Sequence, residues 1–290
     1  NVAVGGNTSS SQATFSANTT GIRNVAIGMG ALRNNSSADQ NVAIGFEALY
    51  SATTNGANTA VGGYALESNT AANNTAVGYL SLYDNTTGAS NVAVGREALQ
   101  SNTTATGNTA VGFQAGESAT TGDGHVFVGY QAGQSITTGT NNTAVGYEAL
   151  ETATTAANNT AVGLRSLRVT TGNNNVAIGH NAMLDNTSGS PNVAVGQGAL
   201  QRNTTGGSNV AVGQGALEDN TTASANTAVG RDAFANVTTG SQNTAVGNEA
   251  GVTLTTGSQN TFVGEDAGYL ATTGTYNVFL GKNSGQSITT

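Results

Sequence analysis

Histidine is the side chain used most often for proton transfer and metal binding, and only two histidines occur in this 290-residue sequence. His125 and His180 lie far apart, and neither has a partner at the spacing of a metal-binding or catalytic motif. Cysteine is absent, which excludes disulfides and thiolate metal sites. We expect no catalytic residue, no metal ligand and no cofactor site, with both histidines on the surface or in a ladder of stacked side chains.

One regular column of acidic side chains consists of Asp232, Glu249 and Asp266, which follow one another at intervals of 17 residues. Like charges about 5 Å apart on stacked strands repel each other, and Ca²⁺ would relieve that repulsion. We favour a solvated face moderated by Arg231 and Lys282. A polysaccharide lyase would need carboxylates and basic groups clustered on one face, whereas the eight basic residues are spread along the chain. The sequence therefore predicts that the chain is not an enzyme.

The composition departs from that of an ordinary globular domain. Charged residues make up 8% of the chain, against roughly 25% in typical soluble proteins. There are 41 Gly and one Pro, and much of the 37% hydrophobic fraction is Ala and Val, so one thick core is not expected. The net charge of −8 leaves no basic patch for nucleic acid, and no apolar run approaches the roughly 18 residues of a membrane helix. We expect neither nucleic-acid binding nor membrane insertion.

A five-residue motif recurs along the chain: Asn, then Val or Thr, Ala, Val or Ile, and Gly. Its seventeen copies start at residues 1, 24, 41, 58, 74, 91, 108, 125, 142, 159, 175, 192, 209, 226, 243, 260 and 277, with His in place of Asn at 125. The sixteen intervals are 17 residues thirteen times, 16 twice and 23 once. Such regularity indicates stacked structural repeats.

Each copy is numbered here from its Asn as repeat positions 1 to 17. Positions 2 and 4 carry Val, Ile or Thr, position 5 is Gly, positions 8 and 9 are usually Ala-Leu, and positions 13 and 14 are often Thr-Thr. We expect positions 2, 4 and 9 to fill the interior of each coil. The pattern predicts an all-β fold, a β-solenoid (β-roll or β-helix) of about 17 coils with a 17-residue repeat. Residues 1–290 form one repetitive segment with a loop insertion at 6–13, which we interpret as an excerpt of a longer fibre.

Asparagine at position 1 predicts a structural ladder, because side-chain amides stacked along the axis hydrogen-bond to one another. We place in this ladder Asn41, Asn58, Asn74, Asn91, Asn108, Asn142, Asn159, Asn175, Asn192, Asn209, Asn226, Asn243, Asn260 and Asn277.

Position 6 changes character along the chain, being apolar in most early copies and polar from the eleventh copy onward. If it points outward, the early copies carry an apolar stripe that serves as a lateral interface, and otherwise these side chains pack at their own corners. The stripe comprises Met29, Phe46, Tyr79, Phe113, Tyr130, Tyr147 and Leu164.

Threonine-rich returns and glycosylation sequons leave two further questions open. Ice binding uses flat arrays of Thr at alternate positions of one face, whereas the Thr-Thr pairs are adjacent and point to opposite sides. Asn-x-Thr sequons at Asn85, Asn102, Asn203 and Asn220 arise from composition alone, and glycosylation stays open.

The strings NVAIG and NTAVG resemble the head repeats of trimeric autotransporter adhesins and the repeat arrays of phage tail fibres. The resemblance implies a left-handed β-roll in which three chains pack side by side and bind host surfaces. The 17-residue period and the Thr-Thr return depart from the shorter adhesin repeat. We expect a structural segment of an extracellular fibre or cell-surface adhesin, with a virion tail-fibre shaft and an ice-binding solenoid as alternatives. The expected partners are other copies of the chain, joined laterally or end to end, and host-surface glycans or proteins.

Overall fold

The computed structural model describes residues 1–5 and 13–289, and within them it contains seventeen short parallel strands and no helix. This confirms the all-β solenoid with a 17-residue repeat. Two compact units, Asn1–Asn142 and Thr143–Thr290, are described separately. The predicted loop insertion lies, apart from Ala13, outside the described residues.

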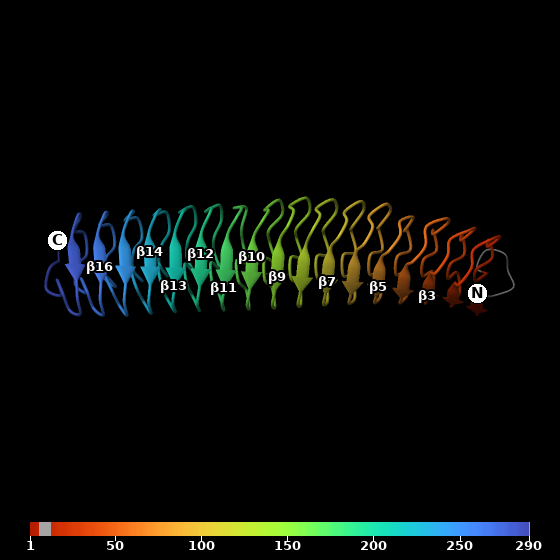
Figure 1. Cartoon of the computed structure of the whole chain (residues 1–290), viewed down its shortest axis with the longest axis horizontal. Coiled ribbons are helices and arrows are strands. Elements are labelled where there is room, and N and C mark those ends of the chain that lie inside the picture. The colour runs from red at the N-terminus through yellow and green to blue at the C-terminus, as the bar shows by residue number, and fades with distance from the viewer. Residues whose placement is uncertain (6–12, 290) are drawn as a thin grey trace. The chain divides into compact units, whose positions relative to one another are not determined.

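Each strand is three residues long and begins at position 2 of its repeat. Within each unit, Figure 1 shows successive strands side by side and pointing the same way. The first unit contains β1 (Val2–Val4), β2 (Val25–Ile27), β3 (Val42–Ile44), β4 (Thr59–Val61), β5 (Thr75–Val77), β6 (Val92–Val94), β7 (Thr109–Val111) and β8 (Val126–Val128). The second contains β9 (Thr143–Val145), β10 (Thr160–Val162), β11 (Val176–Ile178), β12 (Val193–Val195), β13 (Val210–Val212), β14 (Thr227–Val229), β15 (Thr244–Val246), β16 (Thr261–Val263) and β17 (Val278–Leu280).

Within each unit, consecutive strands pair in parallel and in strict register. In the β3–β4 pair, for example, Ala43 lies opposite Ala60, and Val42 lies opposite Thr59. Every position of one repeat therefore stacks on the same position of the next, which turns each repeat position into a column along the axis.

The strands point the opposite way from the prediction. Position 3 faces the interior, where Ala43 and Ala60 are fully buried, while positions 2 and 4 face outward and are half-buried or exposed. The prediction that Val at positions 2 and 4 fills the core is wrong. Side chains alternate along a strand, and the interior of so small a coil accepts the smaller Ala column.

The second apolar segment is buried as expected, but it is a turn. Ala98 and Leu99 have no exposed surface, and Leu99 adopts a left-handed φ of 49°. Leu recurs with similar φ in the same position of many repeats, so close packing of the core offsets a conformation that costs a non-glycine residue about 1–2 kcal/mol.

Where position 9 is Gly, an aromatic residue fills the missing volume. A Cβ at Gly116 or Gly133 would lie 2.6 or 2.4 Å from the ring of Phe127, which replaces Ala at position 3. Ile136 at position 12 is also fully buried in this layer. Phe262 fills the corresponding space beside Gly268. The core therefore keeps its volume by exchanging large and small residues across the coil.

Candidate functional site

The position 1 asparagines, predicted to form an amide ladder, join backbone groups of the same and the next coil. Asn91 Oδ1 accepts the backbone N–H of Asn108 at 2.9 Å, and Asn91 Nδ2 donates to the carbonyl of Ala105 in its own coil at 2.8 Å. Most members of this column are buried. One amide thus closes a coil and binds it to its neighbour.

Amide-to-amide bonds occur in this column between Asn226, Asn243 and Asn260, at 3.2 and 3.1 Å, and a second amide ladder lies at position 12. Asn102 Nδ2 donates to Asn85 Oδ1 at 2.6 Å, and Asn220 Nδ2 donates to Asn203 Oδ1 at 2.7 Å. All four side chains are fully buried. These are the four sequon asparagines considered above, so none of them is accessible for glycosylation in the folded chain.

His125 replaces Asn in the position 1 column and reproduces part of its bonding. Its Nδ1 accepts the N–H of Asn142 at 3.2 Å, its own N–H donates to Asn108 Oδ1 at 2.8 Å, and its ring stacks on Phe127 at 4.7 Å. Burial lowers the pKa of His125, while hydrogen bonding to Gly139 and Asn142 and the charge of Asp123 oppose that shift. The neutral ring suits an acceptor at Nδ1, which protonation would destroy.

We expect the stability of the first unit to fall as the pH drops below about 6.5, the pKa of an unperturbed histidine. The folded-state pKa of His125 is lowered by burial, so the unfolded chain binds the proton first, and protonation favours unfolding. Thermal unfolding between pH 7 and pH 5 measures the effect. The control variant His125→Asn restores the ladder residue, and its melting temperature should change less over this interval. Parallel curves for both proteins would contradict the prediction.

The position 6 side chains predicted as a lateral interface lie outside the core. Tyr79, Tyr130, Tyr147 and Leu164 are each more than 40% exposed, and Met29, Phe46 and Phe113 are half-buried. Within the first unit, Phe113 stacks on Tyr130 at 5.3 Å, and Tyr64 contacts both Phe46 and Tyr79 edge-on. These rings pack on one another and still present surface, so their role as an interface stays a prediction.

The acidic column at position 7 is tied to neighbouring basic groups. Arg231 contacts both Asp232, at 3.6 Å, and Glu249, at 2.5 Å, as expected. Lys282 instead pairs at 2.9 Å with Glu265, which lies at position 6 beside the column. Among the described residues, no group of three or more His, Asp or Glu side chains is arranged to hold a metal ion. His180 is exposed at position 6.

The outward columns at positions 2 and 4, here called the outer strand face, form a surface that sequence reasoning missed. Every one of the seventeen copies has Val or Thr at position 2 and Val, Ile or Leu at position 4, so the face carries no charge. Val111 and Ile178 are 37% and 39% exposed. The alternation of these residues around position 3 could have predicted an outward face. It was not recognised because positions 2 and 4 were assigned to the core.

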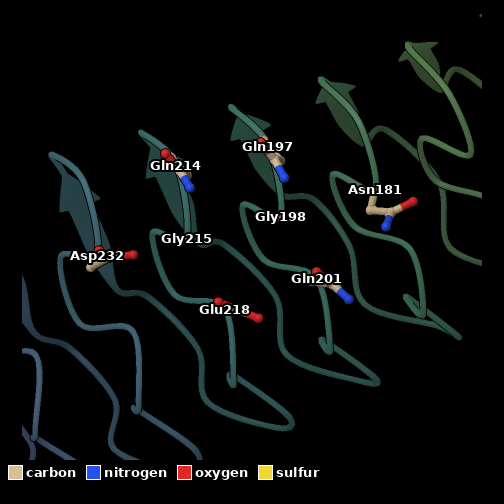
Figure 2. A pocket seen from close by; sticks show the side chains of 8 residues that line it. All are labelled: Asn181, Gln197, Gly198, Gln201, Gln214, Gly215, Glu218 and Asp232. Carbon is tan, nitrogen blue, oxygen red and sulfur yellow. The ribbon is translucent and has the colours of Figure 1, made fainter.

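A polar depression lies on the second unit where position 7 is Gly in two successive repeats, Gly198 and Gly215 (Figure 2). Its volume is about 110 Å³. Figure 2 shows Gln197 and Gln214 on one side of the two glycines, and Gln201 and Glu218 on the other. Asn181 and Asp232, the position 7 residues of the flanking repeats, bound its two ends.

Comparison with known proteins identifies no relative: no family model, no curated protein and no solved structure matches the chain. The described residues also contain no helix long and apolar enough to cross a membrane.

Proposed function

We propose that the chain is a structural segment of an extracellular fibre or surface adhesin. Its role is to give reach and to present side chains at regular intervals, and the shaft of a virion tail fibre is the same architecture in another setting. The hydrogen bonding supports this role, because backbone and side-chain groups of one coil are satisfied by the next. In such a fold, most of the stabilising bonds join one coil to the next and so extend the stack along one axis.

The observation that carries the proposal furthest is the uncharged outer strand face. Parallel sheets occur almost always with both faces covered. The nine strands of the second unit, three residues long and about 4.8 Å apart, present an outer face of about 400 Å². Position 2 is Thr in five of these nine strands, and the continuous apolar part of the face is the position 4 column of Val, Ile and Leu. An exposed apolar column of this length favours an interaction site. In the fibre, this face packs against the same face of further copies of the chain.

Sedimentation of the purified chain tests this association. The wild type should sediment as an oligomer, and a variant with Thr227→Lys and Thr244→Lys on the outer strand face should sediment as a monomer, because like charges would then meet in the interface. A second variant, with Phe113, Tyr130 and Tyr147 replaced by Ser, tests the position 6 stripe. Loss of mass only in this second variant would assign the lateral contact to the stripe, and a monomeric wild type would refute self-association.

Ice binding is the second candidate, because the outer strand face presents a regular outward array of side chains, which the Thr-Thr pairs do not. At positions 13 and 14, Thr103 Oγ1 donates to the carbonyl of Thr120, and only Thr104 points to solvent. On β14 and β15, by contrast, Thr and Val occupy alternate outward positions in register. Thermal hysteresis of the monomeric chain would support an ice-binding face, and its absence would eliminate this candidate.

A further inference from the structure

The depression around Gly198 and Gly215 is a built feature of the repeat and not a gap between elements. Position 7 carries a larger side chain in most repeats, including Gln114, Gln131 and Glu148, and this is the one place where two successive repeats carry Gly. Two missing side chains leave a pit with backbone as its floor.

The lining selects the chemistry of a ligand. Four amides, from Asn181, Gln197, Gln201 and Gln214, offer both hydrogen-bond donors and acceptors, while Glu218 and Asp232 add acceptors. No apolar side chain larger than Gly and no basic side chain lines the pit. An apolar ligand would find no contact surface, and a phosphate or carboxylate would be repelled by the two carboxylates.

One atom at the edge of the pit lacks a partner. Asn181 Oδ1 is buried and accepts no hydrogen bond, which costs free energy until a donor reaches it. The terminal torsion of an Asn side chain rotates easily, so a small turn of this amide presents the oxygen to a ligand hydroxyl. The depression is thus rich in hydrogen-bond acceptors and favours a ligand that carries hydrogen-bond donors.

From this geometry we infer that the pit binds one neutral pyranose unit of a saccharide, whose hydroxyl groups donate to Glu218, Asp232 and Asn181 and accept from the glutamine amides. The volume of the pit, about 110 Å³, is below the roughly 300 Å³ at which ligand pockets begin, so a bound sugar ring stays partly in solvent. The shallow, solvated setting predicts weak binding, with a Kd on the order of 1 mM. This inference does not depend on the proposed structural role.

The decisive variant is Gly198→Gln, which places in the pit a side chain that the same position carries elsewhere. Gln114 and Gln131 adopt φ of 52°, close to the 66° of Gly198, so the backbone accepts the change. A Cβ at Gly198 would approach only the flexible amide of Gln201, at 3.2 Å. The matched control is Asn248→Gln, a position 6 residue outside the pit.

The test titrates neutral oligosaccharides built from glucose, galactose, mannose and N-acetylglucosamine into the whole chain, with NMR shifts of the Gln and Asn side-chain amides as the readout. Binding of at least one neutral sugar, weakened at least tenfold by Gly198→Gln and unchanged by Asn248→Gln, is the expected result. Absence of binding by all four sugars, or equal binding by Gly198→Gln, would overturn the inference. Binding that disappears on addition of EDTA would instead assign the pit to a divalent cation and also overturn it.

Discussion

Replacing Gly95 with alanine is expected to destabilise the first unit by about 4 kcal/mol or more, a loss at the extreme of single substitutions. Gly95 directly follows β6 and has a φ of 137°, a region that residues with side chains rarely adopt. A Cβ there would lie 2.2 Å from the carbonyl oxygen of Gly112 in the next coil. Backbone stacked on both sides cannot move away, so the strain separates the coils. Circular dichroism during urea unfolding measures the loss, and hydrogen exchange locates it.

The matched control is Gly107→Ala. Gly107 also has a positive φ, of 67°, but a Cβ there would meet nothing within 4 Å. Ala57 and Ala225 occupy the same repeat position with φ of 60° and 59°. The control should therefore change the free energy of unfolding by about 1 kcal/mol at most. Equal losses in both variants would show that positive φ alone, without the close approach between coils, causes the effect.

Replacing Asn226 with leucine is expected to destabilise the second unit by about 3 kcal/mol, because each buried backbone group left unpaired costs about 1–3 kcal/mol. Asn226 Oδ1 accepts the N–H of Asn243 at 2.9 Å, and its Nδ2 donates to the carbonyl of Gly240 at 2.8 Å. Leucine has nearly the same volume and can replace neither bond. Urea unfolding gives the change in free energy, and faster amide exchange at Asn243 identifies its source.

Asn236→Leu in the same repeat is the control, since Asn236 is exposed and substitutions at such sites usually stay within about 0.5 kcal/mol. A loss for Asn226→Leu no larger than that of this control would mean that the position 1 column only tolerates Asn and draws no stability from it.

Fold class and repeat length followed from the sequence alone, because in a stacked fold the same residue types recur at the length of one coil. The glycine corner at position 5 and the buried apolar pair at positions 8 and 9 are local requirements: Gly95 must be Gly for its φ, and Leu99 must be buried to offset its own. The same residue types are required at these positions in each repeat, so the seventeen copies reveal the requirement even when the shape of the coil is unknown.

The direction of the side chains was decided only by the tertiary structure. A three-residue strand such as VAV allows either face to be inside, and the choice depends on how much room the rest of the coil leaves. Here the Leu column of position 9 already fills the interior, and Ala at position 3 is what fits beside it. That choice turns Val and Thr outward and creates the outer strand face. The second amide ladder, at position 12, was likewise not predicted, because only stacking in three dimensions brings Asn85 and Asn102 within hydrogen-bonding distance.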